Sequence, residues 1–151
     1  MTRAALRVLT PADQADALRL YATLTGDNPL GGAGAFQAVL DHSGTEIWGA
    51  ELDGRIASMA TLHLMPNVTY SGRPYGLIEN VVTLRSHQGL GLGRQVMQAV
   101  IAAAWEADAY KLMLLTGRHV GAKGFYEKLG FSDAGKHGMM LRRVPMRQAQ
   151  V

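Results

Sequence analysis

The sequence predicts a single mixed α/β (α+β) domain that spans residues 1–151, and three observations support this fold class. Strand-like runs alternate with segments of helical periodicity along the chain, which is typical of a sheet flanked by helices. The length is that of one ordinary domain, and no proline- or serine-rich linker divides it. Hydrophobic residues make up 48% of the chain and charged residues 18%, so the composition provides a sizeable core and excludes a disordered chain.

The first half of the chain predicts a strand, two helices and a hairpin. Thr10 is a suitable N-cap, with Pro11 in the first turn of the helix that follows. Asp53-Gly54 separates two strand-like runs, and this dipeptide is one of the stronger short-range hairpin signals. The expected elements are a strand over 4–9, a helix through Ala17 and Leu24, a loop over 30–34, a short helix through Phe36 and Leu40, and strands over 45–52 and 55–64.

The second half predicts a buried strand that leads through a glycine-rich stretch into a helix. The run Ile78, Val81, Val82 indicates burial on both faces at the centre of a sheet. Apolar residues between positions 96 and 105 form a broad helical stripe. The expected elements are a strand over 75–84, this helix, a strand over 110–115, a short helix over 122–129, a strand that opens at Phe131 and a last strand over 139–144.

Residues 86–97 carry three glycines, at positions 89, 91 and 93, between the strand and the helix. Glycines let the backbone pass close to a ligand, and the helix adds unpaired N–H groups and the positive end of its dipole. The stretch therefore predicts a phosphate-binding loop, with a plain glycine-rich turn as the other interpretation. A dinucleotide fingerprint fits less well, because it requires an acidic residue after the next strand, where this chain has Thr116-Gly117.

The charge of the chain is unevenly distributed. Residues 1–84 carry five Lys/Arg and eight Asp/Glu, whereas residues 85–151 carry ten and four, for a formal net charge of +3. The basic half contains the glycine-rich loop, which suits a polyanionic ligand, although a solvated basic surface explains the pattern as well.

The residue types limit the chemistry and the cellular setting. The absence of cysteine excludes disulfides, thiolate metal sites and a cysteine nucleophile. No metal-ligand spacing is found among His42, His63 and His137, so no metal is expected. No signal-like segment and no apolar run near the ~20 residues of a membrane span is evident, so we expect a cytoplasmic protein without a membrane or nucleic-acid partner.

Two motifs resemble signatures of the GNAT family of N-acetyltransferases. Gln88-Gly89-Leu90-Gly91-Leu92-Gly93 is similar to the family's (Arg/Gln)-x-x-Gly-x-(Gly/Ala) signature, and Phe125-Tyr126-Glu127-Lys128-Leu129-Gly130-Phe131 is similar to its second signature. The order of expected elements matches along most of the chain. The resemblance implies a mixed, mostly antiparallel central sheet that is splayed at its middle strands.

The resemblance also implies acetyl-coenzyme A (acetyl-CoA) as the co-substrate that donates the acetyl group. Backbone N–H groups of the glycine loop are expected to hold its pyrophosphate, and the splayed central strand to pair with its pantetheine arm. The implied coenzyme-binding residues are Asn80, Val81, Val82, Gln88, Gly89, Leu90, Gly91, Leu92, Gly93 and Arg94.

Acetyl transfer to an amine needs a base, because an alkylammonium with a pKa near 10.4 must lose a proton, at a cost of about 4 to 5 kcal/mol at pH 7. Glu79 is the candidate, since a carboxylate on a strand expected to be buried needs a function or a partner; pairing with an arginine is the open alternative. By resemblance, Tyr126 is expected to donate a hydrogen bond to the coenzyme sulfur. His119 and His87 are weaker candidates for the base, because loop histidines with no visible partner are usually solvated.

A closer likeness exists to the glucosamine-6-phosphate N-acetyltransferase branch, through Ile78-Glu79, the glycine loop, Tyr110-Lys111 and the second signature. The chain departs from that branch at Asn80, which stands where an aspartate is usual, and at Leu115-Thr116, where an acidic residue is usual. The segment 116–124 is also about two residues longer. The resemblance therefore implies an amine acceptor and leaves its identity open.

We expect direct attack by the primary amine of a small molecule in a ternary complex, with an amino sugar phosphate as one candidate. Two other functions stay open, namely a non-catalytic acyl-CoA sensor and an enzyme that acetylates protein N-termini or lysines. Members of the family often form homodimers, and the sequence leaves the oligomeric state open.

Overall fold

The computed structural model describes residues 2–145, and the chain divides after Leu114 into two compact units. The first unit contains β1 (Ala5–Val8), η1 (Pro11–Asp13), α1 (Gln14–Thr25), α2 (Gly32–Asp41), β2 (Thr45–Leu52), β3 (Arg55–Met65), η2 (Tyr70–Gly72), β4 (Tyr75–Thr83), η3 (Arg85–His87), α3 (Leu92–Glu106) and β5 (Leu112–Met113). The second contains α4 (Lys123–Glu127). The single domain over 1–151 stays a prediction, and Met1 and residues 146–151 lie outside the described residues.

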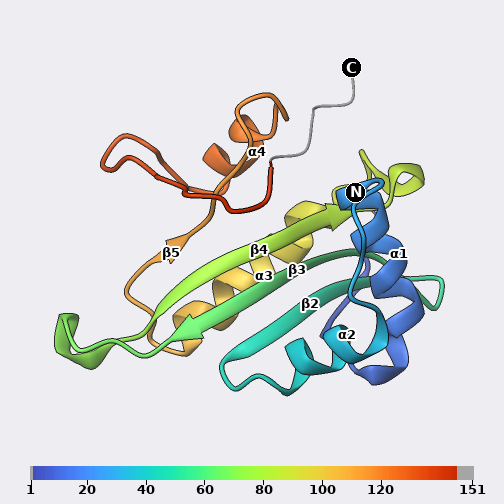
Figure 1. The fold of residues 1–151 in the computed structure, drawn as a ribbon, viewed down its shortest axis with the longest axis horizontal. Helices are drawn as coiled ribbons and strands as arrows, with labels where there is room; N and C mark the ends of the chain where they lie inside the picture. Colours follow the sequence, from blue (N-terminus) through green and yellow to red (C-terminus); the bar gives the residue numbers. More distant parts are fainter. Residues whose placement is uncertain (1, 146–151) are drawn as a thin grey trace. The chain divides into compact units, whose positions relative to one another are not determined.

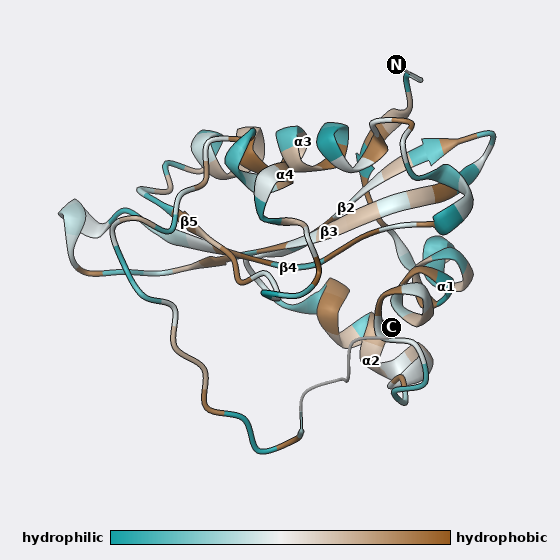
Figure 2. Ribbon diagram, turned by 90° about the horizontal axis from the view of Figure 1, so that it is seen from above, coloured by the Kyte–Doolittle hydropathy of each residue, from teal (hydrophilic) through white to brown (hydrophobic). Residues whose placement is uncertain are grey.

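The first unit is a five-stranded sheet in the order β1-β2-β3-β4-β5, with helices on both faces (Figure 1). Neighbouring strands are antiparallel except β4 and β5, which are parallel. Helices α1 and α2 lie on one face of the sheet and α3 lies on the other (Figure 2). This arrangement confirms the predicted fold class of a mixed, mostly antiparallel sheet flanked by helices.

Strands β4 and β5 separate soon after they meet. Their pairing is limited to Gly76 with Leu112 and Leu77 with Met113. Beyond Leu77, β4 has no strand partner on this side among the described residues, although β3 continues to pair with it on the other side. The backbone of residues 78–83 therefore presents a free edge on the β5 side.

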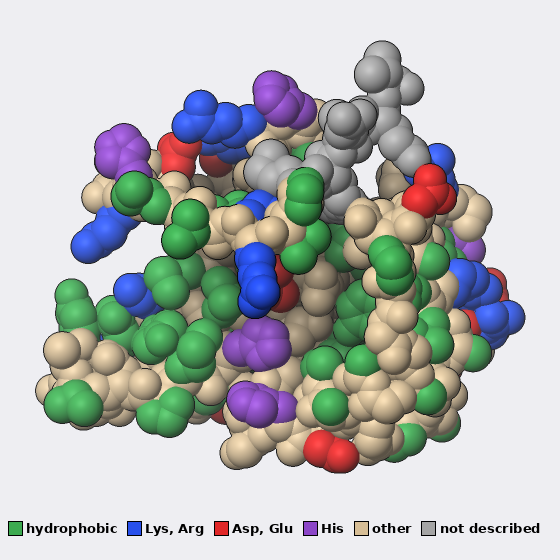
Figure 3. Space-filling view, viewed as in Figure 1, with side chains coloured by type: hydrophobic (Ala, Val, Ile, Leu, Met, Phe, Trp, Pro, Cys, Tyr) green, Lys and Arg blue, Asp and Glu red, His purple; other side chains and the backbone are tan. Residues whose placement is uncertain are grey.

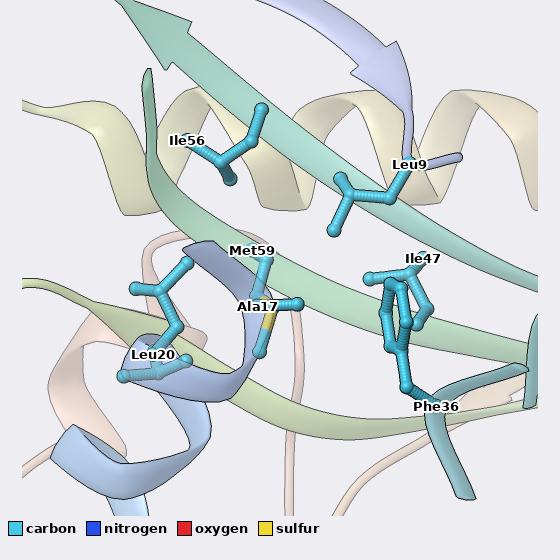
Figure 4. Packing of buried hydrophobic residues seen from close by; sticks show 8 residues of the cluster. Leu9, Ala17, Leu20, Phe36, Ile47, Ile56 and Met59 are labelled. Carbon is cyan, nitrogen blue, oxygen red and sulfur yellow. The ribbon is translucent and has the colours of Figure 1, made fainter. Parts of the chain in front are cut away.

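An apolar core holds α1 and α2 on their face of the sheet (Figure 4). Fully burying one such side chain contributes about 1.5 to 3 kcal/mol. The opposite face is covered by the predicted apolar stripe of α3, which is buried at Val96, Met97 and Val100. The cluster on the α1 and α2 face consists of Leu9, Ala17, Leu20, Phe36, Ile47, Ile56, Met59 and Val82.

The hairpin and the first helix start as predicted. Asp53 and Gly54 both have left-handed backbone angles, with φ of 52° and 75°, as a tight two-residue hairpin turn requires. Helix α2 begins at Gly32, so the predicted loop over 30–34 is shorter than expected. A glycine inside a helix costs only about 1 kcal/mol, and burial of Phe36 on this helix outweighs that cost.

The predicted strands at the end of the chain are wrong. Residues 131–145 contain no strand, and no backbone hydrogen bond pairs residues 132–145 with another segment of the described chain. The segment over 139–144, in which four of six residues are apolar, suggested a strand, but a strand needs a neighbouring backbone to pair with. The same limit shortens β5, predicted over 110–115, to two residues, because its ladder with β4 ends there.

No helix within residues 2–145 combines the length and the apolar character needed to cross a membrane.

Candidate active site

The glycine loop ends at the N-terminus of α3. Gly89 and Gly91 have φ of 80° and 78°, a left-handed conformation in which a side chain is strained. Gly91 is the N-cap of α3, and no side chain caps this helix end. The first N–H groups of α3, from Leu92 onward, therefore have no partner within the helix and can be offered to an anion. The loop has the features of a phosphate cradle.

The side chains of the loop contribute differently from its backbone. Leu92 is buried in the core under α3, so its side chain anchors the helix and only its N–H group is left for a ligand. Gln88 is exposed, and its Nε2 donates to the Thr83 carbonyl at 3.4 Å. Leu90 and Arg94 are exposed. Coenzyme contacts of these residues and of Gly93 stay predictions.

A hollow of about 590 Å³ lies next to this loop, between α1, the β2–β3 turn and η3. Arg85 belongs to its lining and forms no ion pair among residues 2–145. Arg19 and Arg55 also line it and share the carboxylate of Asp16, at 3.1 Å and 2.8 Å. Two guanidinium groups thus share one carboxylate, and the hollow has a basic side beside the loop.

A β-bulge interrupts β4 where the sheet is open. Thr61 pairs with Glu79 and Met59 pairs with Val82, so Asn80 and Val81 are the two residues that together face Ala60 of β3. Asn80 has a φ of 53°, in the left-handed region. A bulge bends its strand and redirects side chains, and bulges are frequent beside active sites.

Glu79 precedes the bulge and is exposed. The premise that its strand buries it is therefore wrong, because the bulge and the free edge of β4 open the sheet there. The alternative of an arginine partner is not found either, since no ion pair or hydrogen bond of Glu79 occurs among the described residues. Glu79 lies opposite Thr61 and hence on the α1 and α2 face, and its role as a base stays a prediction.

Two histidines and a threonine form a chain of hydrogen bonds on the same face, and sequence reasoning missed it. Thr45 Oγ1 lies 2.8 Å from His42 Nδ1 and 2.8 Å from His63 Nδ1. Thr45 is buried, His63 is half-buried and His42 is exposed. His63 pairs with Leu77, two residues before Glu79, so His63 and Glu79 are diagonal neighbours about 7 to 8 Å apart in the backbone.

The surroundings of His63 favour its neutral form. Burial lowers the pKa of His63, and the positive charge of a protonated His42 lowers it further, while the Glu79 carboxylate acts in the opposite direction. A histidine that is neutral at pH 7 can accept a proton.

A threonine and a tyrosine complete the polar lining of this face. Thr61, opposite Glu79, is buried, and its hydroxyl makes no well-aligned hydrogen bond within residues 2–145. Burial raises the pKa of the Tyr21 hydroxyl on α1, and contact with Thr61 partly offsets this increase. An unpaired buried hydroxyl is costly, and a polar substrate can satisfy it.

Tyr126 lies on α4, in the second unit. Its ring packs edge to face against Phe125 and Phe131, with centroid distances of 5.0 Å and 6.2 Å. Burial raises the pKa of Tyr126, so its phenol stays protonated at neutral pH and acts as a hydrogen-bond donor. Its predicted contact with the coenzyme sulfur stays a prediction.

The other histidines weighed as bases have simpler surroundings. His87 Nδ1 lies 2.8 Å from the hydroxyl of the neighbouring Ser86, and His119 is exposed in the second unit. Within residues 2–145, no three histidine or acidic side chains are grouped so that they could hold a metal ion.

Comparison with known proteins agrees with the fold. The model of the acetyltransferase (GNAT) family matches residues 13–131. The glucosamine 6-phosphate N-acetyltransferase of Trypanosoma brucei brucei is 33% identical over 138 residues, which cover 83% of this chain and 87% of that protein.

Solved structures give the same result. A protein of Agrobacterium tumefaciens str. C58 assigned as an acetyltransferase superimposes with a TM-score of 0.87 at 40% identity, over 92% of this chain and 99% of that one. An acetyltransferase of Trypanosoma brucei superimposes with a TM-score of 0.79 at 32% identity, over 91% and 98% of the two chains. The chain belongs to the GNAT family and is an acetyl-transferring enzyme.

Proposed function

We propose that the protein transfers the acetyl group of acetyl-CoA to the primary amine of a small molecule, by direct attack in a ternary complex. The observation that carries the proposal is the N-terminus of α3, which follows two left-handed glycines and lacks a side-chain cap. This geometry suits the pyrophosphate of coenzyme A, because several N–H groups and the helix dipole meet at one point.

The free edge of β4 provides a path from the loop to the reacting group. The amide groups of the pantetheine arm pair with the backbone of Asn80, Val81 and Val82, which β5 leaves unpaired. At about 3.3 Å per residue, the four residue-to-residue steps from Asn80 to Leu84 span roughly 13 Å, a distance that suits an extended arm. The thioester then lies beside the bulge and Glu79.

Four bond changes complete the reaction. The amine nitrogen attacks the thioester carbonyl carbon, and the C–S bond breaks. The amine N–H bond breaks as its proton passes to the Glu79 carboxylate, and the Tyr126 hydroxyl donates a hydrogen bond to the departing thiolate. Because removal of the ammonium proton costs about 4 to 5 kcal/mol at pH 7, the base is expected to decide the rate.

The basic hollow beside the loop suits the nucleotide end of the coenzyme. Arg85 precedes the glycine loop by only a few residues, and the ribose 3′-phosphate is one sugar away from the pyrophosphate. A phosphomonoester near Arg85 gains a charge-assisted hydrogen bond without displacing an existing ion pair.

An amino sugar phosphate is the first acceptor to test, because the Trypanosoma brucei brucei relative is a glucosamine 6-phosphate N-acetyltransferase. A different amine is the alternative outcome, because the chain lacks the usual acidic residues of that branch at Asn80 and at Leu115-Thr116.

The test measures thiol release from acetyl-CoA with glucosamine-6-phosphate, free amino sugars, polyamines, aminoglycosides and peptides. Turnover with a small amine supports the proposal. Turnover with peptides only identifies a protein acetyltransferase, and coenzyme binding without turnover on any amine identifies a sensor; either result contradicts it.

A further inference from the structure

We propose that His63, Thr45 and His42 form a proton relay, which carries the proton released by the attacking amine from the Glu79 end of the site to solvent. The inference rests on the proposed acetyl transfer and assigns a route for its proton. Figure 3 shows that histidine side chains lie next to one another on the face of the molecule that it presents.

The geometry of the relay is continuous. The Thr45 hydroxyl oxygen is 2.8 Å from Nδ1 of His63 on one side and 2.8 Å from Nδ1 of His42 on the other. Both distances are hydrogen bonds of ordinary length for a hydroxyl and a ring nitrogen. The relay begins at the half-buried His63, passes the buried Thr45 and ends at the exposed His42. It thus leads from the sheet surface to solvent.

The hydroxyl sets the protonation of the two rings. Thr45 has one proton to donate, so when both rings are neutral one Nδ1 must donate to Thr45 and the other must accept from it. With His63 as the donor, its Nε2 carries a free lone pair and is the atom that can receive a proton. His42 then accepts from Thr45 and carries its own proton on Nε2.

Proton transfer along this chain is balanced. His63 Nε2 takes the amine proton, directly or through the Glu79 carboxylate, and His63 Nδ1 gives its proton to Thr45 Oγ1. Thr45 passes its own proton to His42 Nδ1, and His42 releases its Nε2 proton to water. No charge stays behind on the relay, the thiolate leaves with coenzyme A, and each ring returns to its starting tautomer by proton exchange with water.

The groups that face His63 support this direction of transfer. They are Glu79 from β4 and His42 from the end of α2. Burial keeps His63 neutral at pH 7, while the Glu79 carboxylate stabilises the transient imidazolium. The exposed His42 has ready access to solvent.

A purely structural role is the competing explanation, because the three side chains also join the end of α2 to the open end of the hairpin. The Thr45 N–H donates to the His42 carbonyl at 3.1 Å, and the Leu64 N–H donates to the Gly44 carbonyl at 2.7 Å. These backbone bonds remain when the side-chain hydroxyl is removed. Thr45→Val therefore removes the relay and keeps the shape of the residue.

The experiment compares Thr45→Val with Thr45→Ser, using thiol release with the amine that the wild-type protein uses best. We expect Thr45→Val to lower kcat roughly 100-fold, with an unchanged KM for acetyl-CoA, and Thr45→Ser to stay within about threefold of wild type. His137→Gln, an exposed histidine of the second unit, is the control and keeps full activity. Equal losses in the two threonine variants, or full activity of Thr45→Val, overturn the relay.

A second variant covers the case in which Thr45→Val does not fold. His63→Ala is expected to lose activity and to regain part of it with added imidazole, which a structural role does not provide. In wild type, kcat/KM is expected to fall more steeply below the ordinary histidine pKa of about 6.5 than protonation of the amine alone requires, and this additional fall is lost in His63→Ala. A lack of rescue together with an unchanged pH profile overturns the relay. Wild-type protein that releases no thiol with any amine overturns the proposed acetyl transfer instead.

Discussion

Thr45 lies opposite His63 in the β2–β3 pair, with its hydroxyl oxygen 2.8 Å from the His63 Nδ1. This pairing depends on a bulge in β3, where Ala57 is the extra residue. If the register next to the hairpin turn continued without the bulge, Thr45 would face Leu62 instead. Leu62 lies on the α3 side of the sheet, because alternate residues of a strand point to opposite faces. One extra residue in β3 therefore brings the polar chain to the same face as Glu79.

Gly91→Glu is expected to abolish acetyl-CoA binding. The added carboxylate repels the pyrophosphate at the N-terminus of α3, and the left-handed φ of 78° strains any side chain by about 1 to 2 kcal/mol. Isothermal titration calorimetry with acetyl-CoA measures the effect. Gly34→Glu adds the same charge to the exposed side of α2, where a new side chain meets open space, and is expected to bind normally. Unchanged binding by Gly91→Glu would rule out the loop as the pyrophosphate site.

Tyr126→Phe is expected to lower kcat by about 100-fold, because one hydrogen bond to the departing thiolate is lost. Coenzyme binding and thermal stability are expected to change little, since the ring packing against Phe125 and Phe131 remains and the hydroxyl has no hydrogen-bond partner among the described residues. Steady-state kinetics and a thermal melt of the same preparation check both parts. A variant as active as the parent removes the catalytic role of Tyr126.

Glu79→Gln keeps the size and exposure of the side chain and removes its charge. We expect a loss of kcat of about 100-fold at pH 7 and partial recovery at high pH, where the free amine is more abundant. The control is Glu106→Gln, an exposed residue at the end of α3. A pH profile of kcat/KM that is identical in wild type and Glu79→Gln is incompatible with Glu79 as a base.

Arg85→Ala is expected to reduce the preference for coenzyme A over 3′-dephospho-coenzyme A. Arg85 lines the basic hollow, and a charge-assisted hydrogen bond to a phosphate at the surface is worth about 1 kcal/mol, or roughly fivefold in affinity. Calorimetry with both coenzymes and both proteins forms a double-mutant cycle. Arg118→Ala, in the second unit, is the control. If Arg85→Ala lowers the affinity for the two coenzymes equally, Arg85 does not contact the 3′-phosphate.

The sequence predicted features that are specified by nearby residues. The hairpin follows from Asp53-Gly54, whose left-handed angles form the turn, and the α3 helix from its own apolar stripe. The glycine loop was predictable for the same reason, because its backbone shape depends on glycines that lie within a few residues of one another.

Features that depend on partners distant in the sequence were not predictable. Glu79 was expected to be buried from its apolar neighbours, but the bulge at Asn80 and the short pairing with β5 leave it exposed. The hydrogen-bonded role of His63 was missed because its pairing with Thr45 depends on a bulge that no local sequence pattern indicates. The run over 139–144 was apolar enough for a strand, yet nothing in the described chain pairs with it.

The pair of Arg7 and Asp13 makes stability depend on pH at the start of α1. Arg7 donates to both carboxylate oxygens of Asp13 at 2.8 Å, and the Thr10 N–H donates to the same carboxylate. The hydrogen bonds from Arg7 are the main cause that lowers the pKa of Asp13. Asp13→Asn is expected to cost about 1 to 2 kcal/mol at pH 7, since Arg7 is partly exposed and water screens the pair.

The sign of the pH effect follows from the lowered pKa of Asp13. The carboxylate stabilises the fold fully above its unfolded pKa of about 3.9, and this contribution is lost as the pH falls through the lower folded pKa. The difference in unfolding free energy between wild type and Asp13→Asn should therefore narrow as the pH falls below about 4. Urea denaturation at pH 7 and at acidic pH measures it, with Asp27→Asn as the exposed control. A difference that stays constant across this range would show that Asp13 acts through its size and not through its charge.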